Sequence, residues 1–175
     1  MALPACTNAI KANIDEKKFN REGPKKFCNA CFDCSHTLLY PVDKNYLKLG
    51  NYINPDDLAA AEQISESLNF EEITRYEKNG VKIGEHTLAG TLRFYGKGTL
   101  EINSYNLQTL RRYFKSALLT QIAFERILKH KKYDCVVVDH GLYVPQGILS
   151  EVANSKKINT KVIWQGHKEN SLLIS

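Results

Sequence analysis

The sequence predicts an α/β protein in which a Rossmann-like parallel sheet is flanked by helices. Residues 135–138, Cys-Val-Val-Val, form an apolar run without polar alternation, which is typical of a strand covered on both faces. Pro145 follows, with apolar residues at helical spacing up to Asn154, and proline suits the first turn of a helix. A second apolar run lies at residues 161–164. Strand, helix and strand in this order predict a parallel βαβ unit with a right-handed crossover.

We expect the rest of the chain to be organised around residues 132–164, with 135–138 as a central strand. Upstream, Asn54 is the expected N-cap and Pro55 the first residue of a helix that runs to about Ser67, because both residue types favour these positions. Residues 70–76 can form one more helical turn, and Asn79 with Gly80 predicts a turn.

Two longer helices are expected between this turn and the first strand. Residues 83–94 can form a helix that ends before Gly96 and Gly98. Residues 106–131 carry apolar side chains at steps of three and four residues and end in basic residues, which is the pattern of an amphipathic helix with a favourable charge at its C-terminus. A weaker helical pattern covers residues 7–19.

Composition is ordinary for a globular protein. The chain has 175 residues, of which 43% are apolar and 25% charged, and a net charge of +5. We expect one compact unit, with a cysteine-containing N-terminal segment, residues 1–53, packed on a Rossmann-like domain, residues 54–175. The mild positive charge fits phosphates or anionic glycans, and fits a lysine-rich soluble surface equally well. No apolar run reaches the ~20 residues of a membrane span, so a cytoplasmic protein is expected, with peripheral attachment to the inner membrane left open.

Three of the five cysteines form a cluster, Cys28, Cys31 and Cys34, followed by His36. Thiolates at this spacing suit zinc or an iron–sulfur cluster, and ordinary structural cysteines have the same spacing. A fourth ligand with conventional spacing is missing. We therefore predict no tightly bound metal and no cofactor.

Polar residues follow the first predicted strand, at the end where open α/β sheets bind ligands. They are Asp139, His140, Gly141 and Tyr143, and His167 occupies the corresponding loop after the second strand. His140 is a candidate general base, because an imidazole accepts a proton near neutral pH. A hydrogen-bonded structural histidine would look the same in the sequence.

The start of the predicted helix at residues 83–94 gives a second group of candidates. Glu85 and His86 place a carboxylate and an imidazole side by side, which suits acid–base chemistry and also suits a simple helix cap. Arg93, and Arg111 with Arg112, can hold phosphate through paired contacts. A solvated helix face explains these arginines equally well.

Several stretches together resemble the N-terminal, acceptor-side half of bacterial glycosyltransferases of the GT-B-like type, which build capsular or surface polysaccharides. The matching residues are Leu3-Pro4-Ala5-Cys6, the Cys28 and Cys31 pair, 79–85 (NGVKIGE), 91–94 (TLRF), 111–113 (RRY), 139–147 (DHGLYVPQG) and 151–153 (EVA). In such relatives the strand-exit motif is more often Asn-Gly than the His-Gly found here. They also have a first strand before the segment that corresponds to Leu3-Pro4-Ala5-Cys6.

The resemblance implies an incomplete GT-B half that moves a sugar from a nucleotide-sugar to a glycan or lipid-linked acceptor. His140 or Glu85 would be the catalytic base. Asp139, Gly141, Tyr143, His86, Arg93 and His167 would bind substrate. The donor would be held by a second domain that the chain lacks, so the chain is expected to be inactive alone. Uncovered sheet edges make a homo-oligomer the expected assembly, and no nucleic-acid partner is expected.

Two rival interpretations remain. One is a non-catalytic α/β module that binds a nucleotide or a phosphorylated ligand. The other is a small zinc-stabilised protein organised by Cys28, Cys31 and Cys34. Metal analysis of the purified protein separates the zinc interpretation from the other two.

Overall fold

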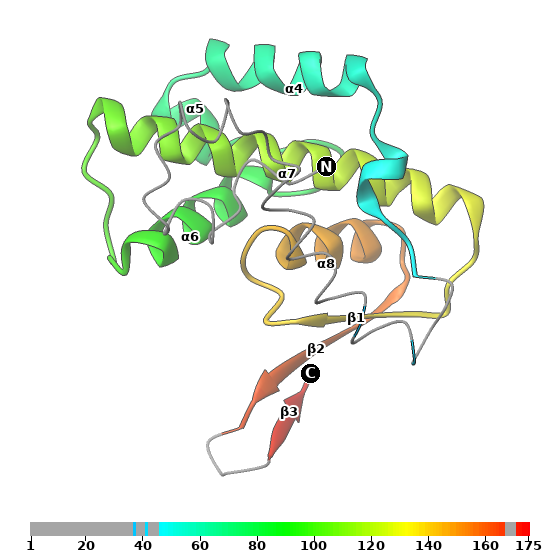
Figure 1. Ribbon diagram of the computed structural model, residues 1–175. Helices are drawn as coiled ribbons and strands as arrows, with labels where there is room; N and C mark the ends of the chain where they lie inside the picture. Colours follow the sequence, from blue (N-terminus) through cyan, green and yellow to red (C-terminus); the bar gives the residue numbers. More distant parts are fainter. Residues whose placement is uncertain (1–36, 38–40, 42–45, 167–170) are drawn as a thin grey trace.

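The computed structural model describes residues 37, 41, 46–166 and 171–175. Over these residues the protein is α/β, with a helical region followed by a small sheet (Figure 1). The elements are η1 (Leu49–Tyr52), α4 (Pro55–Ser67), α5 (Phe70–Thr74), α6 (Ile83–Tyr95), α7 (Ser104–His130), β1 (Cys135–Asp139), α8 (Gln146–Ser155), β2 (Asn159–Gln165) and β3 (Leu172–Ile174). The helix predicted at 7–19 and the cysteine cluster lie outside the described residues, as does most of the predicted N-terminal segment 1–53.

Local signals place the start of α4 where the sequence predicts it. The Asn54 side chain accepts a hydrogen bond from the Asp57 amide at 2.8 Å, and the Asp57 carboxylate accepts one from the Asn54 amide at 2.8 Å. This reciprocal pair satisfies two backbone donors that a helix start would otherwise leave open. Asn69 and Glu72 form the same arrangement at the start of α5.

The two longer helices also agree with the sequence. Helix α6 ends at Gly96, which adopts the left-handed conformation at φ 63°, where glycine carries no steric penalty. Helix α7 begins after Asn103, whose side chain caps the Asn106 amide, and its 27 residues end at His130. Both predicted helices are confirmed, with bounds that shift by one or two residues.

The hydrophobic core is centred on α7 rather than on the βαβ unit. The buried apolar residues from α7 include Leu110, Phe114, Ala117, Leu118 and Leu119, and they meet Ala61, Ile73, Val81, Ile83, Ile148 and Val152 from the surrounding segments. Figure 1 shows α7 running through the middle of the helical region, with α8 between it and the sheet. The expectation that residues 132–164 organise the chain is therefore wrong, because most of the buried residues of this core lie outside that stretch.

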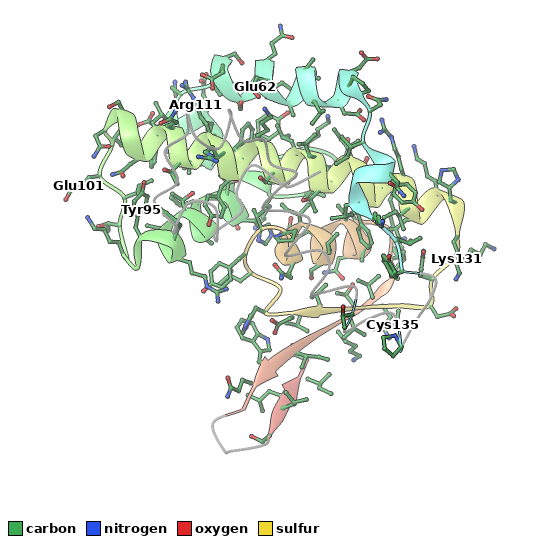
Figure 2. The ribbon with its side chains drawn as sticks, viewed as in Figure 1. Glu62, Tyr95, Glu101, Arg111, Lys131 and Cys135 are labelled. Carbon is green, nitrogen blue, oxygen red and sulfur yellow. The ribbon has the colours of Figure 1, made fainter. Side chains whose placement is uncertain are left out.

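Three ion pairs among the described residues join α4 to α7. Arg111 lies 3.0 Å from a Glu66 carboxylate oxygen, and Arg126 donates to both carboxylate oxygens of Asp57. Lys115 pairs with Glu62 on the same two helices. Figure 2 shows Glu62 on α4 and Arg111 on the neighbouring α7. Asp57 therefore serves twice, as part of the helix start and as the partner of an arginine from α7.

The predicted βαβ unit is present. Strand β1 pairs with β2 in parallel, with Val138 opposite Val162, and α8 connects the two strands. Strand β3 was not predicted. It returns antiparallel to β2, with Leu173 opposite Trp164, so the sheet in the described residues is mixed rather than parallel.

The burial predicted for the first strand is wrong. Val138 is buried against α8, whereas Val137 is 57% exposed. The strand order β1-β2-β3 makes β1 an outer strand among the described residues. One face of the sheet packs on α8, and the other carries Val137, Leu172 and Ile174 in exposed positions. The apolar run indicates a strand, but it does not tell which of its faces a helix covers.

This open apolar face predicts self-association. Exposed apolar patches and unpaired strand edges favour contacts between molecules. We expect dimers or larger species in sedimentation velocity, and we expect Val137→Lys to shift the population towards monomer. The matched control is Ile102→Lys, because Ile102 is 59% exposed and lies outside the sheet. A wild-type protein that remains monomeric at high concentration and unfolds cooperatively would contradict the prediction.

No helix within the described residues is long and apolar enough to cross a membrane.

Candidate functional site

The chain turns sharply where β1 ends. His140 and Gly141 both adopt the left-handed conformation, at φ 62° and 58°, and the His140 amide donates to the Ile163 carbonyl at 3.1 Å. A histidine in this region is uncommon. A Cβ atom at Gly141 would lie 3.0 Å from a methyl group of Val162, so both the backbone angle and the space favour glycine here. We call residues 140–145 the strand-exit loop.

The His140 ring lies in an exposed group of polar and aromatic side chains. It meets Trp164 edge-on, with 5.3 Å between ring centroids, and its Nε2 lies 3.4 Å from an Asp139 carboxylate oxygen. Trp164 is 38% exposed. We call Asp139, His140 and Trp164 the strand-exit cluster. The sequence placed Asp139 and His140 at the carboxyl end of β1 as predicted, but it did not single out Trp164 as a site residue.

Helix α6 contacts the strand-exit loop through two residues that were predicted to bind substrate. The Arg93 guanidinium lies over the Tyr143 ring, 4.3 Å from its centroid, a favourable contact between a cation and an aromatic face. His86 is buried, and its Nδ1 lies 2.7 Å from the Leu142 carbonyl oxygen. The structure therefore brings Arg93 and His86 to the loop. Their predicted contact with a substrate stays a prediction.

Glu151 on α8 completes the surroundings of His86. One carboxylate oxygen lies 3.3 Å from His86 Nε2, and the other accepts from the Lys82 amide at 2.5 Å. Burial by itself would lower the pKa of His86, but the contacts with Glu151 and the Leu142 carbonyl outweigh it and raise the pKa above 6.5. Burial raises the pKa of Glu151, but the contacts with His86 and the Lys82 amide outweigh it and lower the pKa below 4.5. Each partner thus favours the charged form of the other.

The other predicted site residues are less closely tied to the loop. Glu85 is exposed at the start of α6, where its carboxylate lies 3.3 Å from the Lys82 ammonium. Its role as a base stays a prediction. His167 lies outside the described residues. Gly166, which precedes His167 in the sequence, donates a backbone hydrogen bond to the Ser171 carbonyl at 2.8 Å.

The arrangement combines groups that bind neutral polar ligands. Asp139 offers carboxylate acceptors, His140 offers an imidazole, and Trp164 offers a partly exposed apolar ring, all at the carboxyl ends of β1 and β2. In the residues described, no group of three or more histidine, cysteine or acidic side chains is arranged to hold a metal ion.

Comparison with known proteins finds no family model, no curated relative and no solved structure that matches this chain.

Proposed function

We propose that this chain is the acceptor-binding side of a bacterial glycosyltransferase that transfers a sugar from a nucleotide-sugar to a surface glycan or a lipid-linked acceptor. The strand-exit cluster carries this proposal. An exposed tryptophan ring can stack on the C–H face of a sugar, while Asp139 and His140 can hydrogen-bond its hydroxyl groups. The carboxyl ends of parallel strands are where open α/β sheets bind their ligands.

In the proposed reaction His140 is the base. When its Nε2–H faces Asp139, at the 3.4 Å separation seen here, Nδ1 carries the lone pair. An acceptor hydroxyl then gives its proton to Nδ1 while its oxygen bonds to the anomeric carbon of the donor. The bond from that carbon to the diphosphate oxygen breaks, and the nucleoside diphosphate leaves with the electron pair. Asp139 fixes the ring and stabilises the imidazolium.

The proposal includes a second Rossmann-like domain that supplies the donor site, as in GT-B-like enzymes, with this α/β unit as the other half. It also places the reaction on the cytoplasmic side of the inner membrane, where lipid-linked acceptors are made. The resemblance in the strand-exit motif and the position of the strand-exit cluster support this assignment together.

The test is a binding measurement that does not need the donor domain. Purified chain is titrated with a panel of bacterial capsular oligosaccharides by calorimetry. Trp164→Ala is expected to weaken binding about tenfold, because losing an aromatic contact face costs on the order of 1.5 kcal/mol. Ile174→Ala is the matched control, since Ile174 is also exposed on the sheet but lies on the opposite face from Trp164.

Two outcomes would contradict the proposal. Equal loss of affinity in Trp164→Ala and Ile174→Ala would show that the strand-exit cluster is not the binding site. Binding of free nucleotides by the isolated chain, with no oligosaccharide bound, would favour the non-catalytic nucleotide-binding module instead.

A further inference from the structure

The strand-exit loop is hydrogen-bonded to a buried histidine, His86, on α6. The Leu142 carbonyl oxygen, in the middle of the loop, lies 2.7 Å from His86 Nδ1. A carbonyl oxygen can only accept a hydrogen bond, so Nδ1 must carry the hydrogen. The loop is thereby connected through one imidazole ring to α6.

The other ring nitrogen is then the group that responds to pH. With the hydrogen on Nδ1, a neutral ring would turn the Nε2 lone pair towards Glu151, at 3.3 Å. Both groups would be acceptors, and His86 Nε2 is buried with no hydrogen bond aligned to it. A proton on Nε2 replaces this repulsion by the attraction of an ion pair, which is stronger at this partly buried position than in water.

The ring has little freedom to avoid Glu151. A Cβ atom at position 147 would lie 2.2 Å from His86 Nδ1, so the ring rests directly on the backbone of α8 at Gly147. Glu151 is fixed as well, because its second oxygen accepts from the Lys82 amide at the start of α6. Rotation of the ring would also give up the bond to Leu142.

We propose that His86 and Glu151 form a proton-dependent clasp, closed when His86 is protonated, that fixes the strand-exit loop and so positions the strand-exit cluster. His86 is a positioning residue in this proposal and does not touch substrate. The clasp itself stands on the contacts of the described residues. The inference that it regulates acceptor binding rests on the function proposed above.

The charges around the clasp set the pH range in which it is closed. Glu151 faces His86 from α8, Glu85 adds negative potential from the same helix as His86, and Lys82 acts on Glu151. Because the pKa of His86 is raised above 6.5, its stabilising effect is complete below that pH and is lost as the pH rises through the raised value. Because the pKa of Glu151 is lowered below 4.5, its effect is complete above that pH and is lost in more acidic solution.

NMR spectroscopy tests the clasp without any ligand. The imidazole nitrogen shifts of His86 report its pKa and the position of its hydrogen. The amide signals of Gly141 and Leu142 report the state of the loop. We expect His86 to titrate above 6.5, with Nδ1 protonated throughout, and we expect the loop amides to change in the same pH range. Single His140→Gln and His167→Gln variants identify any change in the loop amide signals that the titration of another histidine causes.

Glu151→Gln is the decisive variant, and Glu85→Gln is its matched control. Glu151→Gln should lower the pKa of His86 and uncouple the loop amides from its titration, because an amide keeps the size of the side chain but carries no charge. Glu85→Gln removes a nearby carboxylate whose ion pair is with Lys82 and which acts on His86 through its charge alone, so its effect on the pKa of His86 should be smaller. A pKa of His86 at or below 6.5 in the wild type, or equal effects of the two variants, would overturn the clasp. Replacing His86 itself could unfold the protein, because its ring is buried. Glu151→Gln leaves the ring in place and avoids that problem.

Affinity measurements then separate the clasp from the proposed function. If the clasp positions an acceptor site, wild-type affinity for the capsular oligosaccharides should fall as the pH rises through the pKa of His86, and Glu151→Gln should bind with a flat profile in that range. If the loop amides follow His86 while no oligosaccharide binds at any pH, the clasp stands and the proposed function fails. If His86 titrates as expected but the affinity for oligosaccharide does not change over the same pH range, the inference that the clasp regulates acceptor binding is overturned.

Discussion

Under the proposed function, His140→Ala is expected to lower glycosyl-transfer turnover by roughly 10²–10⁴-fold while the fold is retained, because this is the usual effect of losing a general base. The assay combines this chain with the donor-side domain that the proposal includes, together with nucleotide-sugar and acceptor. His140→Asn gives a sharper version of the test, since asparagine tolerates the left-handed conformation that His140 adopts at φ 62°. It removes the base while it preserves the turn.

Glu85→Gln is measured in parallel because Glu85 is the other candidate base. A large loss in both His140 variants, with near-normal turnover in Glu85→Gln, would assign the role to His140. The opposite pattern would assign it to Glu85. Near-normal turnover in all three variants, with every donor and acceptor that the parent enzyme uses, would show that neither residue is the base and that His140 is a structural residue of the turn.

Phe114→Ala is expected to lower the free energy of unfolding by about 3–5 kcal/mol, which is typical of removing a buried phenylalanine. Phe114 is fully buried at the centre of α7 and meets the Tyr76 ring edge-on at a centroid distance of 5.0 Å. The measurement is equilibrium unfolding in urea. Ile102→Ala is the control, because Ile102 is mostly exposed and such positions change stability by about 0.5 kcal/mol or less. A loss below about 1 kcal/mol in Phe114→Ala would show that the core around α7 collapses into the space or is less tightly packed than described.

The sequence was most informative where the cause of the structure is local. Asn54 and Pro55 predicted the first residue of α4, and Gly96 predicted the end of α6, because caps depend on a few neighbouring residues. The parallel pairing of β1 with β2 was also predictable, since strand, helix and strand leave few arrangements open. The same unit placed Asp139 and His140 at the carboxyl end of a strand.

Features that depend on contacts between distant segments were not predictable. The exposure of Val137 depends on which helices cover the sheet, and β3 is only three residues long. The pairing of His86 with Glu151 joins two helices that are far apart in the chain, and neither residue carries a local signal for it. Trp164 is part of an apolar run that suits a buried strand just as well as an exposed binding face.

The contacts of Asp57 link the start of α4 to α7. Its carboxylate accepts from the Asn54 amide and from Arg126, and Arg126 also donates to the Tyr52 carbonyl at 2.7 Å. Fraying of the first turn of α4 would therefore break the salt bridge between Asp57 and Arg126. It would also weaken the hydrogen bond from Arg126 to the Tyr52 carbonyl. Amide hydrogens in that turn should exchange with solvent through openings that involve α7, instead of through the independent fraying that is usual at a helix end.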